Sequence, residues 1–331
     1  MPPTAPAPRR RARTRRRAAS PVRHAGRGVV GALVLVLTLG LMLFAPGLAV
    51  ATSAAAPASW SDRPAALAPT YARNLSSMRH SGDVYAAWAT PGRQILEFDP
   101  RGNGRVVEVF GDLATAQRVA ILVPGVDSRG ENFSTGLGDV RDRAPAVQAR
   151  SLWRSAQRAN PSGHVAVIAW LGYETPRGVG RDAAREELAR AGAGELTGFV
   201  TDLTRLRPHA SISVLGHSYG SVVTGLAAAH LPRQVRSLVV FGSPGLGVRR
   251  AADLHTRARL WDGRASSDWI DWVPAVQVWG VGHGTPPSTP GFGAHAFGTA
   301  GVADHDHYLA PGTESLANIT DIVVGRPDLA R

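Results

Sequence analysis

The sequence predicts an α/β fold in which a mostly parallel sheet carries helices on both faces. Four short and almost continuous apolar runs follow one another along the chain, at residues 119–123, 165–169, 212–215 and 238–241. Strands that are buried on both faces of a parallel sheet have this composition. Segments with helical periodicity separate the runs, and this alternation indicates a doubly wound sheet.

Composition places the chain among globular proteins and excludes cysteine chemistry. The chain has 331 residues, of which 44% are hydrophobic, enough for a sizeable core. It has no cysteine, which excludes disulfides, thiolate metal sites and a cysteine nucleophile. The net charge of +12 is concentrated at one end, because nine of the 37 arginines lie within residues 1–27. In the rest of the chain, 28 arginines are nearly balanced by 25 acidic residues. We therefore expect no nucleic-acid partner for the folded part.

The first 64 residues have the organisation of an export signal. Residues 1–27 form an Arg-rich n-region, residues 28–51 a hydrophobic segment and residues 52–64 an Ala/Ser/Pro-rich linker. Pro46-Gly47, followed by small residues, favours a cleaved secretory signal. The alternative is a retained anchor, since residues 29–51 are long enough to span a bilayer with the arginines on its cytoplasmic side. In both cases we expect the remaining chain to lie outside the cytoplasmic membrane, secreted or in the cell envelope.

Residues 65–92 are expected to be mainly helical, because apolar residues recur there at helical spacing. Pro69 and Gly82 are expected to interrupt this segment. We expect it to pack against the main domain or to cover part of a site.

The main domain is expected to cover residues 93–328 and to begin with a β-hairpin. Two extended runs, residues 94–98 and 105–110, flank a Gly/Pro/Asn-rich turn, and this pattern predicts a hairpin at one edge of the sheet. Helices are predicted between the later strands and at the end of the chain, over residues 140–160, 195–206 and 313–324.

The run at residues 212–215 leads into Gly216-His217-Ser218-Tyr219-Gly220, and a helix candidate follows at once. A serine hydroxyl is a weak nucleophile and must stand clear of the backbone, where a base can take its proton. A sharp strand-to-helix turn presents it in this way, and the two glycines leave room where strand and helix meet. The pattern predicts Ser218 as a nucleophile and the Tyr219 N–H as one donor to an oxyanion. A tight structural turn is the alternative.

The second oxyanion donor is expected from the turn after residues 119–123, because sites in open α/β sheets lie beyond the carboxyl ends of the strands. The turn reads Pro124-Gly125-Val126-Asp127-Ser128. We expect the Val126 N–H to complete the oxyanion hole, with the Asp127 N–H as second choice. An ordinary turn is the alternative.

The base must be a histidine that follows the acid, in the chain order serine, aspartate, histidine. Four histidines meet this condition: His283, His295, His305 and His307. His305 is favoured, because its polar loop precedes the terminal helix and is free to reach over the sheet. His217, inside the turn, is expected to point away from the reacting face.

The acid is expected after the next strand, residues 258–261, where Asp262, Asp268 and Asp271 follow. Asp268 is favoured because it lies on a loop, residues 263–268, that is followed directly by apolar residues. Asp262 and Asp271 remain alternatives. Its role is to hold the tautomer of the imidazole and to stabilise the imidazolium. The alternative for each aspartate is a solvated loop or a helix cap.

Aromatic residues near these segments are candidates for lining the site. Trp170 and Tyr173 lie just past a strand end and are expected to border the cleft. Trp269, Trp272 and Trp279 line an apolar acyl site or pack in the core.

Several motifs in order carry a resemblance that covers roughly residues 90–325. They are Gly92–Pro100, Gly111-Asp112-Leu113, Val123-Pro124-Gly125, Gly216–Ser221, Phe241–Gly245 and Ser315–Ile319. With them the chain resembles an actinobacterial α/β-hydrolase family that was long catalogued as a domain of unknown function and is often found in exported proteins. The resemblance implies the α/β-hydrolase fold, a serine hydrolase with a Gly-His-Ser-Tyr-Gly elbow, and supports Ser218, Asp268 and His305 by position.

The chain departs from that family around the proposed base. Where the family is expected to have Gly-His-Ser, this chain reads Asp304-His305-Asp306, although it keeps Tyr308 three residues after the histidine. The departure places extra negative charge beside His305.

These residues predict an exported enzyme, a serine hydrolase that acts on a small-molecule or lipid-like carboxylic ester or thioester through an acyl-enzyme and needs no cofactor or metal. One alternative is a catalytically inactive binding module of the cell envelope. Another is a metal-dependent hydrolase that uses Asp304, His305, Asp306 and His307 with His295. Membrane association is expected through residues 29–51 if they are retained. Acyl-chain length, transfer to an acceptor other than water, and oligomeric state are left open by the sequence.

Overall fold

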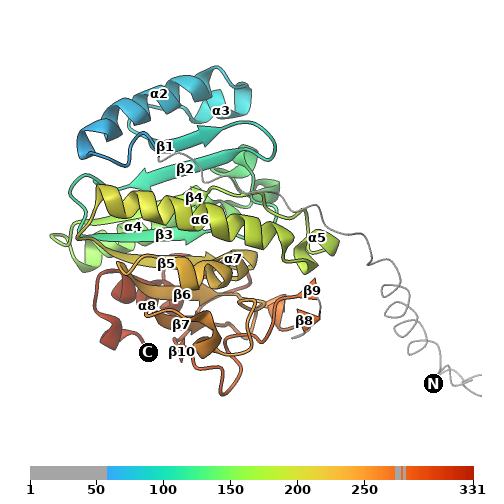
Figure 1. The fold of residues 1–331 in the computed structure, drawn as a ribbon. Helices are drawn as coiled ribbons and strands as arrows, with labels where there is room; N and C mark the ends of the chain where they lie inside the picture. Colours follow the sequence, from blue (N-terminus) through green and yellow to red (C-terminus); the bar gives the residue numbers. More distant parts are fainter. Residues whose placement is uncertain (1–57, 273–276, 279–280) are drawn as a thin grey trace, which may run out of the picture. The chain divides into compact units, whose positions relative to one another are not determined.

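The computed structural model describes residues 58–272, 277–278 and 281–331, and these contain one large twisted sheet (Figure 1). In the described residues this sheet has eight strands in the order β1-β2-β4-β3-β5-β6-β7-β10. They are β1 (Gln94–Asp99), β2 (Arg105–Phe110), β3 (Arg118–Val123), β4 (Val165–Leu171), β5 (Ser211–His217), β6 (Val235–Phe241), β7 (Arg259–Gly263) and β10 (His295–Ala296). The six strands from β4 to β10 are parallel, whereas β2 runs antiparallel to both β4 and β1. The mostly parallel sheet with an N-terminal hairpin at one edge is therefore confirmed.

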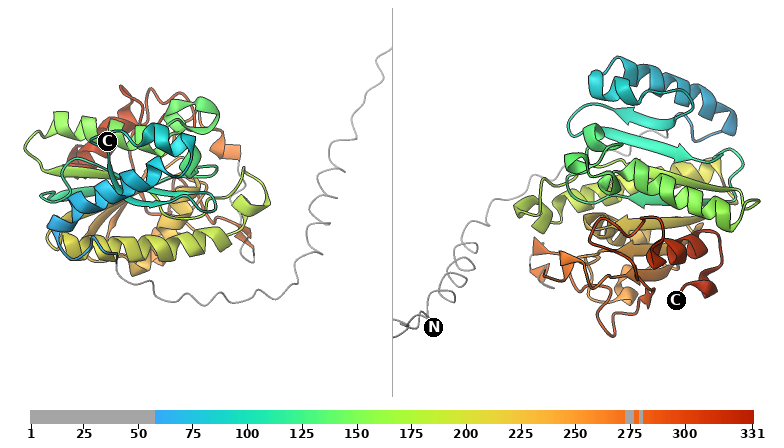
Figure 2. Two further views of the ribbon diagram at one scale, coloured as in Figure 1. Left: turned by 90° about the horizontal axis from the view of Figure 1, so that it is seen from above. Right: turned by 180° about the vertical axis from the view of Figure 1, so that it is seen from behind.

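Helices cover both faces of the sheet (Figures 1 and 2). α6 (Glu187–Leu206) packs with α7 (Tyr219–Ala227) on one face, and α4 (Pro145–Ala159) packs with α8 (Glu314–Val323) on the other. The remaining described α-helices are α2 (Leu67–Arg79), α3 (Asp83–Trp88) and α5 (Arg181–Ala184). α2 packs on β1, at the hairpin edge. A small antiparallel pair, β8 (Gln277–Val278) and β9 (Val281–Gly282), lies outside the large sheet.

The apolar strands divide their side chains between two cores. In β3, Val119, Ile121 and Val123 pack in the cluster that contains α6 and α7, whereas Ala120 and Leu122 pack in the cluster that contains α4 and α8. Successive residues of a strand point to opposite faces, so a strand covered on both sides must be apolar at every position. This explains why the central runs of the sequence show no polar alternation.

Helix boundaries differ from the predictions in ways that the backbone explains. Gly82 breaks the N-terminal helical segment with a φ of 105°, as expected, but Pro69 lies in the first turn of α2 and does not interrupt it, since that turn needs no N–H donor from it. The helix predicted from residue 140 begins only at Pro145, and 3₁₀ turns precede it. The terminal helix is capped by the Thr313 side chain, which accepts a hydrogen bond from the Leu316 N–H.

The predicted n-region, the hydrophobic segment and residues 52–57 of the predicted linker lie outside the described residues. The rest of the predicted linker, residues 58–64, is described, and Trp60 in it is buried in the core. Within the described part of the chain, no helix combines the length and the apolar character that crossing a bilayer requires.

Candidate active site

The turn between β5 and α7 holds Ser218 in a strained backbone conformation. Its φ of 54° and ψ of −128° are unusual for a residue with a side chain. A Cβ at Gly216 would lie 2.6 Å from the Ser221 Cα, and one at Gly220 would lie 2.2 Å from the Val123 carbonyl oxygen. Because neither position has room for a side chain, the two glycines allow the tight strand-to-helix turn that presents Ser218.

The loop after β3 runs against the Ser218 side chain. A Cβ on Gly125 would lie 2.7 Å from the Ser218 Cβ and 3.1 Å from its Oγ, so only a glycine leaves the hydroxyl room. The Asp127 N–H donates to the Pro176 carbonyl at 2.9 Å and is therefore already used. Within the described residues the Val126 N–H has no hydrogen-bond acceptor, and the Tyr219 N–H belongs to the first turn of α7, where amides lack an intrahelical acceptor.

His305 and Asp268 form a buried hydrogen-bonded pair. The His305 Nδ1 lies 2.8 Å from Asp268 Oδ1 and 3.0 Å from Oδ2, and 7% of the histidine side chain and none of the aspartate side chain are exposed. An ionised carboxylate only accepts, so Nδ1 carries the proton and the neutral ring keeps a lone pair on Nε2. Gly242 provides space behind the pair, since a Cβ there would lie 3.0 Å from Asp268 Oδ2 and 3.1 Å from the His305 ring.

Two further groups hold the Asp268 carboxylate in place. The Ile270 N–H donates to Oδ1 at 2.9 Å, and the Tyr308 hydroxyl donates to Oδ2 at 2.7 Å while accepting from the Ala265 N–H. Burial alone would raise the pKa of Asp268, but the hydrogen bonds, the largest from His305, bring that pKa below its ordinary value. Asp268 therefore stays ionised and fixed in orientation.

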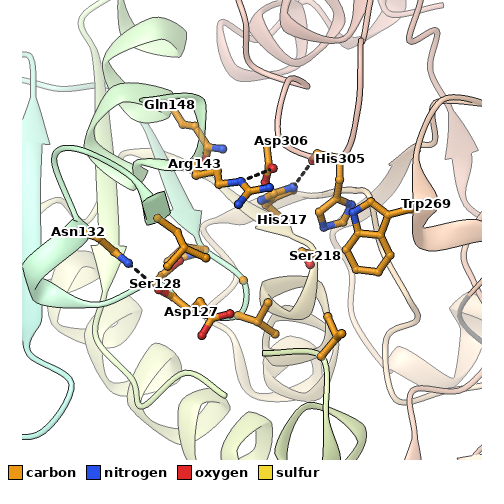
Figure 3. A pocket seen from close by; sticks show the side chains of 15 residues that line it. Asp127, Ser128, Asn132, Arg143, Gln148, His217, Ser218, Trp269, His305 and Asp306 are labelled. Atoms are coloured by element: carbon orange, nitrogen blue, oxygen red, sulfur yellow. Dashed lines mark hydrogen bonds and ion pairs between the residues drawn. The ribbon is translucent and has the colours of Figure 1, made fainter. Parts of the chain in front are cut away.

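His217 does not point away from the reacting face, and this prediction is wrong. Its Nε2 donates to the His305 backbone carbonyl at 2.7 Å, and its ring centroid lies 4.9 Å from that of His305 (Figure 3). On its other side the ring stacks on Phe241 at 5.2 Å. Burial lowers the pKa of His217 to about 4, so the ring is neutral at pH 7. The position of His217 inside the turn suggested only that its side chain points away, and its contact with His305 was not predicted.

A cavity of about 180 Å³ opens onto these groups (Figure 3). Ser218, His217 and His305 line it, and the Trp269 ring lies against the His305 ring with centroids 4.6 Å apart. Across the cavity, Arg143 Nε donates to Asp306 Oδ2 at 2.6 Å. This ion pair balances the charge of Asp306, one of the two carboxylates that the sequence places beside His305.

Comparison with known proteins identifies the family. Residues 99–278, more than half of the chain, match the sequence model of a family described as Alpha/beta hydrolase. The chain belongs to the α/β-hydrolase family. Its mostly parallel sheet with helices on both faces is the α/β-hydrolase fold.

Mycobacterial proteins are among the relatives of this α/β-hydrolase. Uncharacterized protein Rv2079 of Mycobacterium tuberculosis (strain ATCC 25618 / H37Rv) is 32% identical over 265 residues, which cover 71% of this chain and 39% of that protein. Uncharacterized protein Mb0988c of Mycobacterium bovis (strain ATCC BAA-935 / AF2122/97) is 33% identical over 186 residues, or 54% of this chain and 67% of that protein. The match thus spans about two fifths of the length of the first of these relatives.

The solved structures to which the chain is similar are more distant in sequence. XC6422 from Xanthomonas campestris, described as an α/β serine hydrolase without lid, is 15% identical, with a TM-score of 0.42 over 71% of this chain and 93% of that chain. Esterase PE8 is 14% identical, with a TM-score of 0.43 over 65% of this chain and 95% of that chain.

The three other candidate bases, His283, His295 and His307, contact other residues. His307 Nδ1 lies 2.7 Å from Asp304 Oδ1 on the surface. The His283 ring packs edge-on against the Tyr219 ring, with centroids 5.5 Å apart, and His295 is exposed beside Trp261. None of these three rings lines the cavity with Ser218.

The two other candidate acids differ from Asp268. Asp262 lies within β7 and is buried, and burial raises its pKa to about 7. Among the described residues, no histidine hydrogen-bonds its carboxylate. Asp271 lies in the 3₁₀ turn Trp269–Trp272, and its side chain is outside the described part of the structure.

The metal-site hypothesis placed five side chains together, and the structure separates them. His305 is hydrogen-bonded to Asp268, Asp306 to Arg143, and His307 to Asp304. Within the described residues, no three His, Asp or Glu side chains are placed to hold a metal ion.

The aromatic candidates have mixed outcomes. Trp269 lines the cavity, Trp272 is exposed at the end of the same 3₁₀ turn, and Trp279 is outside the described residues. Trp170 and Tyr173 do not border the cleft, because both are buried in the core and stacked with centroids 5.9 Å apart. The Tyr173 hydroxyl instead donates to the Pro124 carbonyl at 2.7 Å and supports the loop that runs against Ser218.

Proposed function

We propose that this α/β-hydrolase is a serine enzyme that cleaves carboxylic esters or thioesters through an acyl-enzyme. Ser218 Oγ attacks the carbonyl carbon while His305 Nε2 takes its proton, and a tetrahedral oxyanion forms. Collapse breaks the bond to the alcohol or thiol, which leaves with that proton. Water then attacks the acyl-enzyme with His305 again as base, and the acid and free Ser218 are released.

The single observation that carries this proposal is the buried His305–Asp268 hydrogen bond at the wall of the cavity that Ser218 lines. A histidine whose Nδ1–H is held by a carboxylate keeps Nε2 basic and stabilises the imidazolium formed during attack. The hydrogen bonds from Ile270 and Tyr308 support the same orientation. These contacts orient the imidazole in the way that proton transfer from Ser218 requires.

Oxyanion stabilisation is assigned to the N–H groups of Tyr219 and Val126. The Tyr219 N–H also benefits from the positive end of the α7 dipole, which favours a developing negative charge. Val126 follows Gly125, whose missing side chain brings the loop backbone next to Ser218. The Asp127 N–H is set aside because the Pro176 carbonyl occupies it.

A fluorophosphonate probe tests this proposal, because it reacts with an activated serine and not with an ordinary hydroxyl. Labelling of the full chain that survives a chelator and is lost in Ser218→Ala is the expected result. Ester turnover that the chelator abolishes would favour the metal-dependent alternative. A folded protein that neither labels nor turns over an ester panel would instead be a binding module.

We also propose that the domain works outside the cytoplasmic membrane. The proposal rests on the Arg-rich, apolar and small-residue order of residues 1–56, which lies in the part of the sequence before the described domain. A reporter fused to these residues and retained in the cytoplasm would contradict it.

A further inference from the structure

Exposed apolar side chains gather around the mouth of the cavity. Of the seven large hydrophobic residues that are exposed in the described part of the chain, five lie in three loops beside it. Their exposed fractions are 87% for Trp272, 68% for Val179, 40% for Leu137, 40% for Val140 and 37% for Trp269. The two others, Val84 and Leu329, lie on α3 and in the last 3₁₀ turn. We call the first five residues the apolar rim.

The topology of the sheet brings the apolar rim together. Its three loops follow β3, β4 and β7, and the carboxyl ends of parallel strands meet at the same edge of the sheet. Leu137, Val179 and Trp269 line the cavity itself. Val140 comes directly after the 3₁₀ turn that contains Leu137, and Trp272 ends the turn that begins at Trp269.

The cavity is small, and polar side chains line it beside apolar ones. Asn132, Gln148 and the partly exposed Arg143–Asp306 ion pair line it together with Pro124 and Val126. Burying a long alkyl chain against these polar groups would be unfavourable. The cavity volume of about 180 Å³ is below the roughly 300 Å³ at which pockets begin to enclose a drug-sized ligand. The cavity therefore accepts an ester group and a few carbons, and the rest of an apolar substrate must lie on the rim.

We propose that this enzyme takes its ester from a lipid layer, with the apolar rim seated in that layer and the ester entering the cavity. The inference rests on the proposed function, since three residues of the rim, Leu137, Val179 and Trp269, line the same cavity as Ser218. Exposed Trp and aliphatic side chains around a site partition into the boundary of a lipid layer. Exposed apolar side chains concentrated beside one site indicate an interaction surface.

Apolar contact, and not charge, is the expected source of this binding. Arg141 and Asp139 flank Val140, and Arg181 and Asp182 follow Val179, so positive and negative side chains alternate beside the rim. Exposed charges of both signs leave little net attraction for an anionic surface. Binding to zwitterionic lipid is therefore expected, with little dependence on salt.

Tryptophan quenching tests where the full chain meets the lipid. Vesicles of phosphatidylcholine with brominated acyl chains quench indole rings that enter the layer, even when another segment of the chain also binds. We expect the vesicles to quench the tryptophan fluorescence of the intact protein. Most of this quenching should be lost in Trp272→Phe, whereas the matched control Trp88→Phe, on α3, should retain it. Equal quenching in the protein and in Trp272→Phe, or none in either, would overturn the inference.

A kinetic experiment separates this inference from the proposed function. In the double variant Val140→Ser/Trp272→Ser, turnover of a long-chain ester in phosphatidylcholine vesicles should fall several-fold, with turnover of a dissolved short-chain ester unchanged. Val84→Ser/Leu329→Ser is the matched control and should lose neither. Equal turnover of the vesicle-borne ester in both double variants contradicts lipid docking and leaves the serine mechanism standing. Because quenching can be measured in Ser218→Ala, failure of the serine mechanism leaves lipid docking testable.

Discussion

Two histidines in the loop before α8, His305 and His307, each hydrogen-bond an aspartate through Nδ1. The distances are nearly equal, 2.8 Å to Asp268 Oδ1 and 2.7 Å to Asp304 Oδ1. Their surroundings differ: 7% and 0% of the His305 and Asp268 side chains are exposed, against 29% and 52% for His307 and Asp304. Two histidines that are two positions apart in the sequence thus form one buried and one exposed pair with aspartate.

The difference lies in what surrounds each carboxylate. Asp268 receives hydrogen bonds from Ile270 and Tyr308 and cannot rotate away from His305. Asp304 is half exposed, so water competes with the histidine and screens its charge. A hydrogen-bond length therefore says little about the function of a His–Asp pair, whereas burial and the neighbours of the carboxylate say much.

The largest expected effect comes from changing the two aspartates in the same way. Asp268→Asn should lower kcat on a soluble ester by about 10⁴-fold, because an amide that turns its NH₂ toward Nδ1 reverses the tautomer of His305. Asp304→Asn should stay within about two-fold, as is usual for an exposed pair. Steady-state kinetics, with circular dichroism to verify folding, make the comparison. Similar losses in both variants would mean that the buried pair is structural.

Much of the fold could be predicted from the sequence because its signals are local. Buried parallel strands read as apolar runs, and Gly216 and Gly220 mark the turn that their backbones require. The two-residue strand β10 could not be predicted, since His295–Ala296 has no apolar run and is a strand only because it lies beside β7.

The candidate site could be predicted less completely, because its supports are tertiary contacts. The pairing of Asp268 with His305 was suggested by chain order and loop position, and the two are hydrogen-bonded. The position of His217 depends on where residues 305–308 fold back over β5, which no local pattern records. The spacing of Tyr308 from His305 could be noticed in the sequence, but its hydrogen bond to Asp268 could be seen only in the structure. The catalytic roles of these residues stay predictions.

An intermediate effect is expected at His217, whose Nε2 donates to the backbone carbonyl of His305. The folded pKa of His217, about 4, is below the unfolded value of 6.5, so its contribution to stability is present above pH 6.5 and is lost as pH falls toward 4. His217→Phe cannot titrate and leaves the His305 carbonyl unpaired, so at pH 7 it should lower the free energy of unfolding by about 1–3 kcal/mol. Urea unfolding between pH 4 and 7 should show the gap between the two proteins narrowing toward low pH. A gap that does not change with pH would contradict the assigned protonation state.

The smallest effect is expected at the exposed pair, His307 and Asp304. The hydrogen bond to Asp304 raises the pKa of His307 above its ordinary value, so the pair stabilises the fold fully below the unfolded pKa near 6.5 and loses this contribution as pH rises through the folded pKa. Because both side chains are partly exposed, His307→Gln should lower the free energy of unfolding by at most about 1 kcal/mol at pH 5.5 and by less at pH 9. Raising the salt concentration should shrink the difference at pH 5.5, since exposed charges are screened. Urea unfolding at the two pH values measures it, and a larger destabilisation at pH 9 than at pH 5.5 would show that His307 is held by packing and not by its charge.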